Sequence, residues 1–174
     1  MRDDIASLLH TDMIEIDPDI TFPPRPECSD KLEIYKWQCK ELVLEKVVDL
    51  LCRSGDVRNA SKLYRDLLNR ERRATTAVGE GLAIPHVRTM QPRDLIMCFM
   101  RFGSGIEFMS LDDKPVYFIF GVITPPYRDK KYISCLSWLS RAFSECFWLK
   151  DSLLAVETPA EVREIMVKLS GQFS

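Results

Sequence analysis

The chain has 174 residues, of which 46% are hydrophobic and 29% charged, a composition typical of one globular domain with a sizeable core. The net charge of −2 and the pI near 5.8 indicate no polycationic surface, so we expect no nucleic-acid partner. No apolar run approaches the roughly 20 residues of a membrane helix, and the N-terminus lacks a signal-peptide pattern, so we predict a cytoplasmic protein without direct membrane insertion.

The N-terminal part predicts short elements and then a stiff loop. Residues 3–9 suggest a short helix, and residues 13–16 alternate between apolar and acidic side chains, as a short strand does. Four prolines fall between positions 18 and 26, and prolines at this density exclude regular structure. We therefore expect a Pro-rich loop or insertion over residues 18–35.

The helical spacing of apolar residues predicts two helices next, the first over residues 36–53 and the second over residues 59–69. Gly55 is a suitable stop for the first helix. The short link between them predicts an antiparallel helical pair. The next segment, residues 70–88, is rich in small residues and includes a short apolar run, Leu82-Ala-Ile, that suits a strand.

The second half alternates strands with helices. Strands are predicted over residues 95–102 and 116–123, and a helix over residues 130–147. The last helix begins at a capping box, Thr158-Pro-Ala-Glu161, and we expect it to end at Gly171. This alternation predicts an α/β fold: one domain spanning residues 1–174, with a mixed β-sheet flanked by helices.

Six cysteines are present, without any C-x-x-C pair, and most lie within apolar periodic segments. This pattern is typical of free, buried thiols in a reducing compartment. With only two histidines and no closely spaced ligand pairs, we expect neither a metal site nor a cofactor.

Residues 70–88 contain the strongest candidate for chemistry. Gly79 and Gly81 flank Glu80, so the backbone there can turn sharply or approach a ligand closely. Pro85 fixes the chain direction immediately before His86. A neutral imidazole carries a nucleophilic lone pair on one ring nitrogen, which makes His86 a candidate nucleophile.

Residues upstream of His86 suit the binding of an anion. The guanidinium of Arg70 offers a fork of donors to phosphoryl oxygens, and Thr75 and Thr76 offer hydroxyl donors. Three further arginines surround the motif and either form a solvated basic rim or attract a phosphorylated donor: Arg72, Arg73 and Arg88. The residues alone leave a simpler interpretation open, in which His86 is an ordinary ring after a proline and Arg70 a surface charge.

The segment Gly79-Glu-Gly-Leu-Ala-Ile-Pro-His86 resembles the signature of the type 2 enzyme IIA family of the bacterial phosphotransferase system, roughly G-x-G-I-A-[IV]-P-H. This is the fructose, mannitol and nitrogen-regulatory branch. Arg70-Glu71 and Thr75-Thr76 also match the family's R-E and S-T at the corresponding distance from the histidine. The resemblance covers residues 36–170 approximately and implies the phosphotransferase/anion-transport-protein-like fold.

The resemblance also implies a mechanism. The phosphorylated histidine phosphocarrier protein would donate a phosphoryl group to His86, while Arg70 neutralises its oxygens. The group would then pass to a cysteine of an enzyme IIB, or stay and report the phosphorylation state to a regulated target protein. Because the chain contains no IIB or IIC segment, we favour the nitrogen-regulatory type over the sugar-transport type.

One departure from the family pattern leaves a second hypothesis open. Family members often have another histidine at the start of the long helix, where this chain has Tyr132, and the remaining histidine, His10, matches no motif. Tyr132 can donate a hydrogen bond but cannot become cationic; Lys130 or Lys131 is a candidate for replacing that charge. The alternative is a non-catalytic regulatory module with the same fold, in which His86 is rarely phosphorylated.

Overall fold

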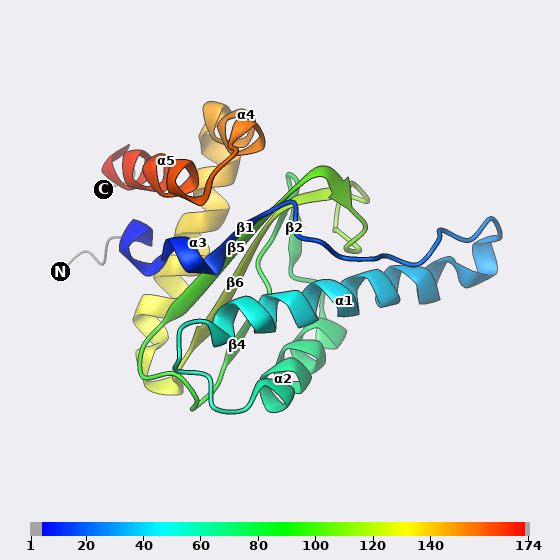
Figure 1. Ribbon diagram of the computed structural model, residues 1–174, viewed down its shortest axis with the longest axis horizontal. Coiled ribbons are helices and arrows are strands. Elements are labelled where there is room, and N and C mark those ends of the chain that lie inside the picture. The colour runs from blue at the N-terminus through cyan, green and yellow to red at the C-terminus, as the bar shows by residue number, and fades with distance from the viewer. Residues whose placement is uncertain (1–4, 173–174) are drawn as a thin grey trace.

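The computed structural model describes residues 5–172 and has three layers, a mixed six-stranded sheet between two groups of helices (Figure 1). In chain order the elements are β1 (Ile14–Ile16), α1 (Leu32–Cys52), α2 (Ala60–Arg73), β2 (Ala77–Gly79), β3 (Leu82–Ala83), β4 (His86–Arg88), β5 (Ile96–Ile106), β6 (Val116–Thr124), α3 (Asp129–Glu145), α4 (Phe147–Ala155) and α5 (Pro159–Gln172). Of four short 3₁₀ turns in the described residues, two precede β1, one precedes α1 and one precedes α3. The predicted α/β class with a mixed sheet is confirmed.

The sheet has the strand order β1-β5-β6-β3-β2, and β4 also pairs with β6. β5 and β6 are antiparallel, whereas β1 runs parallel to β5, and β3 and β4 both run parallel to β6. Leu82 pairs with Phe118 and His86 with Val122, so β3 and β4 follow each other along the same side of β6. Residues 82–88 therefore form one interrupted strand.

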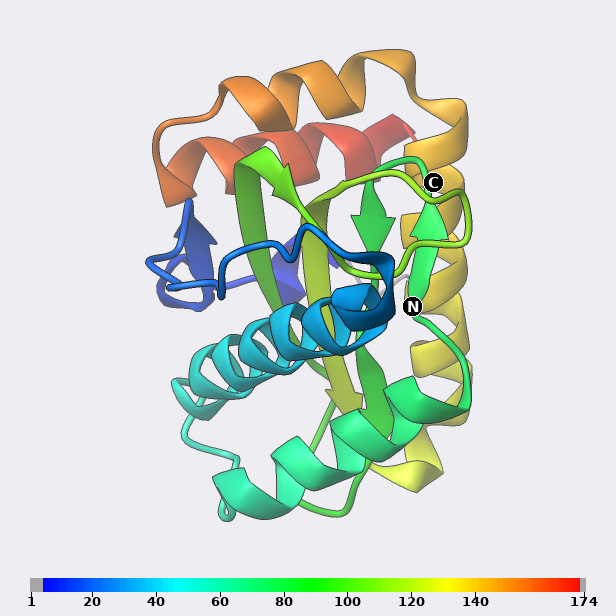
Figure 2. The same cartoon turned by 90° about the vertical axis from the view of Figure 1, so that its right-hand side faces the viewer.

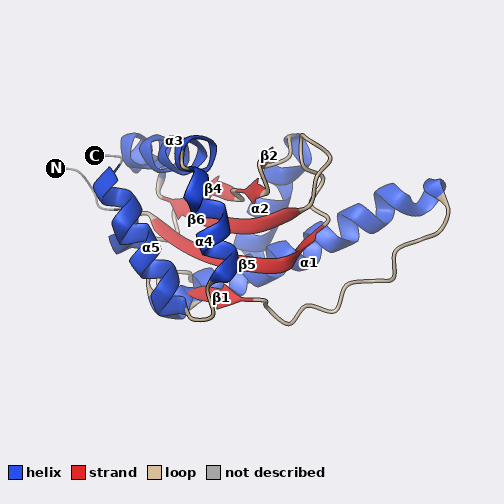
Figure 3. Cartoon of the chain, turned by 90° about the horizontal axis from the view of Figure 1, so that it is seen from above, coloured by secondary structure: helices blue, strands red, loops and turns tan. Residues whose placement is uncertain are grey.

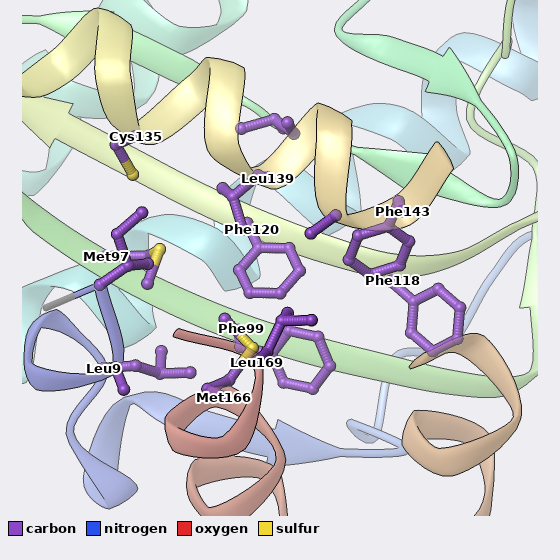
Figure 4. Packing of buried hydrophobic residues seen from close by; sticks show 14 of the residues in the cluster. Leu9, Met97, Phe99, Phe118, Phe120, Cys135, Leu139, Phe143, Met166 and Leu169 are labelled. Carbon is purple, nitrogen blue, oxygen red and sulfur yellow. The ribbon is translucent and has the colours of Figure 1, made fainter. Parts of the chain in front are cut away.

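Both faces of the sheet are buried, which explains the nearly continuous apolar runs of its central strands. Met97 and Phe99 of β5 belong to the core beneath α3, α4 and α5, whereas Ile96 and Cys98 belong to the core beneath α1 and α2. Figure 2 shows α1 and α2 crossing their face of the sheet. Figure 4 shows the opposite core, which includes Phe99 and Phe120. Their rings are in tilted contact, with centroids 4.7 Å apart and an interplanar angle of 49°.

α1 lies very close to the sheet because β6 has a glycine under it. A Cβ atom at Gly121 would lie 2.5 Å from Cγ1 of Val47 and 2.7 Å from Sγ of Cys98. No real side chain tolerates these distances, so Gly121 sets the spacing between α1 and the sheet.

The Pro-rich loop predicted over residues 18–35 is irregular only as far as Cys28, because a 3₁₀ turn and then α1 occupy the rest. After β1 the segment runs away from the sheet to the projecting end of α1 (Figure 3). The 3₁₀ turn is Ser29–Lys31. Cys28 is exposed on this segment; all six cysteines are free thiols, and four of them are buried, as predicted. None of the helices among residues 5–172 is long and apolar enough to cross a membrane.

Several predicted boundaries are wrong. α1 begins at Leu32, before the predicted residue 36, and α2 continues to Arg73, past the predicted residue 69. α4 was not predicted; the helix expected over 130–147 ends at Glu145 and a new one begins after Cys146. Gly171 lies within α5. The predicted first helix lies partly outside the described residues, and its described part is a 3₁₀ turn, Ile5–Leu8.

The capping box at the start of α5 is confirmed. The Glu161 carboxylate accepts hydrogen bonds from the backbone N–H groups of Glu157 and Thr158, at 2.7 and 3.1 Å. The Thr158 hydroxyl accepts one from the Glu161 N–H, at 3.3 Å. These contacts fix the start of α5, as the sequence predicted.

Candidate functional site

His86 is the first residue of β4, and its half-buried ring is held at both nitrogens. Nδ1 lies 2.6 Å from the Ile84 carbonyl oxygen, and Nε2 lies 3.1 Å from Nη2 of Arg70. A carbonyl only accepts and a guanidinium only donates, so Nδ1 must carry the ring proton and Nε2 must carry the lone pair. The surroundings thus select the tautomer in which Nε2 is nucleophilic.

Arg70 belongs to the last turn of α2 and is itself held in place. Its Nη1 donates to the Ala74 carbonyl oxygen at 3.0 Å, while its Nη2 points to His86. One side of the guanidinium fork is thus anchored to the backbone, and the other faces the nucleophilic nitrogen. An anion bound at Nε2 would meet this donor directly.

Tyr132, in the first turn of α3, packs against the ring of His86. Their ring centroids are 5.7 Å apart, with an interplanar angle of 67°, which is an edge contact. The guanidinium of Arg88 lies 5.1 Å from the centroid of the Tyr132 ring. The cation beside Tyr132 is therefore Arg88; Lys131 instead bonds to Asp94 at 3.1 Å.

The electrostatic surroundings favour a neutral His86. Burial lowers the pKa of His86 most, and the positive charges of Arg70 and Arg88 lower it further; the Ile84 carbonyl and the Glu71 carboxylate oppose this. The net shift is downward from the ordinary value of 6.5. At neutral pH the ring therefore keeps its lone pair.

The predicted hydroxyl donors lie in a buried cluster below the site. The Thr76 hydroxyl donates to Oε2 of Glu71 at 2.6 Å, and the Thr75 hydroxyl oxygen accepts from Nζ of Lys40 at 3.1 Å. Nζ of Lys40 and Oε1 of Glu71 form an ion pair at 2.8 Å, with both side chains 1% exposed. We call Lys40, Glu71, Thr75 and Thr76 the buried polar cluster. Thr76 is thus engaged away from the expected phosphoryl position.

Glu80 and Gly81 are not brought to His86. They form the turn between β2 and β3, where Glu80 has a φ of +59° and its carboxylate is paired with Lys150 of α4. The Gly81 carbonyl pairs with Phe118, four residues before the β6 partner of His86, which is about 13 Å along a strand. The glycines of the motif therefore serve the turn.

Pro85 connects β3 to β4, and its carbonyl accepts a hydrogen bond from the Val122 N–H at 2.9 Å. This bond keeps the chain on β6 between the two short strands, so His86 enters the site from a rigid support. The sequence pattern did not identify the Ile84 carbonyl or Lys40. Among residues 5–172, no group of three or more His, Cys, Asp or Glu side chains could hold a metal ion.

Comparisons with known proteins identify the family of the chain. Residues 31–168 match the family described as the phosphoenolpyruvate-dependent sugar phosphotransferase system, EIIA 2. The PTS system fructose-specific EIIA component of Haloferax volcanii is 32% identical over 130 residues, which cover 75% of this chain and 84% of that protein.

Two solved structures are also similar. Nitrogen regulatory protein IIA-Ntr from Neisseria meningitidis superposes with a TM-score of 0.77 at 26% identity, covering 93% of this chain and 98% of that one. Enzyme IIA mannitol of Escherichia coli, solved in complex with phosphorylated enzyme IIB mannitol, gives 0.58 at 20% identity, covering 74% and 88%. The second likeness concerns the fold alone. With the family match over most of its length, the chain belongs to the EIIA 2 family of the phosphoenolpyruvate-dependent sugar phosphotransferase system.

Proposed function

We propose that the chain is a phosphoryl carrier that accepts a phosphoryl group on Nε2 of His86. The observation that carries the proposal is the pair of contacts on the ring, because Nδ1 is bonded to the Ile84 carbonyl and Nε2 faces the Arg70 guanidinium. The first contact leaves the lone pair on Nε2, and the second supplies positive charge where phosphoryl oxygens would lie.

The transfer step follows from this geometry. The donor is the phosphorylated histidine phosphocarrier protein, and the Nε2 lone pair forms a bond to phosphorus as the donor's N–P bond breaks. The electron pair of that bond returns to the donor's imidazole nitrogen. His86 then carries positive charge on a ring protonated at Nδ1, and the Ile84 carbonyl stabilises it. Arg70 moves its Nη2 contact from Nε2 to the phosphoryl oxygens.

For the fate of the group, we favour a regulatory role of the nitrogen-regulatory type, in which the phosphorylation state changes binding to a target protein. The similarity to IIA-Ntr supports this, because it extends over nearly the full length of both chains. Passing the group to a cysteine of an enzyme IIB is the other route, supported by the fructose-specific relative. Adding purified enzyme IIB to the phosphorylated chain and following the mass of both proteins separates these routes.

Intact-mass measurement tests the carrier role directly. The pure protein is incubated with phosphoenolpyruvate, enzyme I and a cognate histidine phosphocarrier protein, beside a His86→Ala variant. We expect an acid-labile gain of one phosphoryl group, which the variant lacks. A folded protein that gains no mass would contradict the proposal.

A non-catalytic interaction module is the second candidate. The observation that favours it is Tyr132, whose ring occupies the position expected for a second histidine and packs on His86. In this case the protein would bind its target equally well with and without the phosphoryl donor system, and His86→Ala would bind as wild type does.

A further inference from the structure

Lys40 is a charged side chain in an unusual place. It lies on α1, it is 1% exposed, and its ammonium lies 4.6 Å from the ring centroid of Phe108 and 5.3 Å from that of Trp37. Burial lowers the pKa of Lys40, and the Glu71 carboxylate counteracts this. A buried ammonium costs several kcal/mol unless it is paired, so the pair with Glu71 is what makes its burial tolerable.

Glu71 does more than neutralise Lys40. Its Oε1 also accepts the backbone N–H of Thr76 at 2.8 Å, and its Oε2 accepts the Thr76 hydroxyl at 2.6 Å. Lys40 in turn donates to the Thr75 hydroxyl oxygen. The carboxylate thus clamps Thr76 directly and Thr75 through Lys40, immediately before β2 begins at Ala77.

Two hydrogen bonds to backbone carbonyls connect this clamp to His86. The Thr76 carbonyl accepts the N–H of Ile84 at 3.0 Å, and the Ile84 carbonyl accepts the Nδ1–H of His86 at 2.6 Å. On the other side of the ring, Nε2 is held by Arg70, the residue immediately before Glu71 in α2. The Glu71 carboxylate is therefore connected to Nδ1 of His86 through Thr76 and Ile84, while Nε2 is held by the residue next to Glu71 in α2.

We propose that Lys40 and Glu71 are positioning residues for His86, which fix its Nδ1-protonated tautomer through Thr76 and Ile84 without touching the phosphoryl group. The catalytic consequence rests on the proposed function, whereas the tautomer is a property of the chain alone. Losing the clamp frees the Ile84 carbonyl to move. The ring proton can then shift to Nε2, which removes the lone pair that attacks phosphorus.

A merely structural ion pair would change stability and leave His86 as it is. The distinguishing measurement is the tautomer of His86, read from long-range ¹⁵N–¹H correlations of its ring in the purified protein. It is measured for wild type, Glu71→Gln and Thr76→Val. The matched control is Arg101→Met, because Arg101 is also buried and bonded, to Asp17 and to the Val156 carbonyl, but lies on β5 outside the cluster.

We expect wild type and Arg101→Met to show the proton on Nδ1, and Glu71→Gln to populate the Nε2-protonated form. Phosphoryl transfer to Glu71→Gln is expected to be about 10- to 100-fold slower, as for a displaced reacting group. Combining Glu71→Gln with Lys40→Met should restore much of the Nδ1-protonated population and of the transfer rate. Once the buried cation is gone, the neutral amide of the glutamine can still accept the Thr76 N–H.

Thr76→Val keeps the Lys40–Glu71 pair and breaks the hydroxyl contact, so it tests the clamp if Glu71→Gln fails to fold. Wild-type tautomer and transfer rate in a folded Glu71→Gln or Thr76→Val protein would overturn the proposal. So would a tautomer change in Arg101→Met as large as theirs. If wild type gains no phosphoryl group, the proposed function is wrong. The tautomer of His86 in the variants still tests the positioning role, because it does not depend on phosphoryl transfer.

Discussion

Arg70 and Glu71 are neighbours in α2, yet they serve two regions of opposite character. Arg70 is half-buried and reaches the half-buried ring of His86, where its Nη2 meets the nucleophilic nitrogen. Glu71 is 2% exposed and closes the buried polar cluster around Lys40. Consecutive helical positions are about 100° apart, so one turn of α2 supplies both regions. Charge at the surface is available for exchange with a ligand, whereas the same charge in the interior is committed to the fold.

The largest expected effect on stability comes from removing Glu71. Glu71→Ala leaves the Lys40 ammonium without a counter-charge and the Thr76 N–H without its acceptor in the interior, and we expect a loss of about 3–5 kcal/mol in the free energy of unfolding. Urea denaturation measures it. Glu41→Ala, which removes the exposed partner of Arg72, is the control and should cost no more than about 1 kcal/mol. Equal losses in the two variants would refute the distinction.

Arg70→Ala should give the reverse pattern. Removing a charged donor from the position of developing phosphoryl charge is expected to slow transfer to His86 by about 10²–10³-fold. The stability loss should stay near 1 kcal/mol, the value of its one bond to the Ala74 carbonyl. Rapid-quench phosphorylation and urea denaturation are the two measurements. Arg73→Ala, an exposed arginine in the same turn, serves as control and should transfer at the wild-type rate.

Tyr132 is expected to act through its ring. Tyr132→Leu removes the edge contact with His86 and the surface under Arg88, a loss of about 0.5–1.5 kcal/mol, or roughly 2- to 12-fold in transfer rate. Tyr132→Phe keeps both contacts and should transfer within about twofold of wild type. A large loss in Tyr132→Phe would show instead that the hydroxyl takes part.

The smallest expected effect is on pH dependence. Burial lowers the folded-state pKa of His86 below its unfolded value of 6.5, so the unfolded chain binds this proton more readily. The corresponding stability is fully present above pH 6.5 and is lost as the pH falls through the folded-state pKa. Denaturation between pH 5 and pH 8, compared with His86→Gln, measures it. The rate of phosphoryl transfer to His86 should also decrease as the pH is lowered over this interval, because protonation removes the Nε2 lone pair. A transfer rate that increases on acidification would contradict a neutral nucleophile.

The sequence predicted much of the fold because helices with one face in solvent show a clear apolar period, and their ends are marked by local capping residues. The capping box of α5 is a local signal of this kind. Asn59, the first residue of the predicted second helix, is instead its N-cap, and its Oδ1 accepts the Lys62 N–H at 2.8 Å. α4 was missed because Phe147–Ala155 continues the apolar pattern of α3. The break at Cys146 has no proline or glycine to mark it.

For the site, the sequence indicated His86, Arg70 and Tyr132 as candidates, and the structure brings these three together. It could not indicate the Ile84 carbonyl, because a backbone acceptor has no sequence signal. Lys40 did have a sequence signal, because it continues the buried stripe of α1. It precedes three buried residues of that stripe by three, four and seven positions: Val43, Leu44 and Val47. Its burial depends on Phe108 and Glu71, which are distant in sequence.

The distribution of thiols described above makes the chain convenient to label. Burial raises the pKa of Cys98 and Cys135 to about 12, so both stay protonated and inert at neutral pH, and Cys39 and Cys146 are also buried. Cys52 is half-buried, and burial raises its pKa too. Cys28 is exposed on the Pro-rich segment, away from His86. A maleimide fluorophore would therefore attach chiefly there without any cysteine being engineered out. Such a dye would report on whether the projecting end of α1 meets a partner when a phosphoryl group is exchanged.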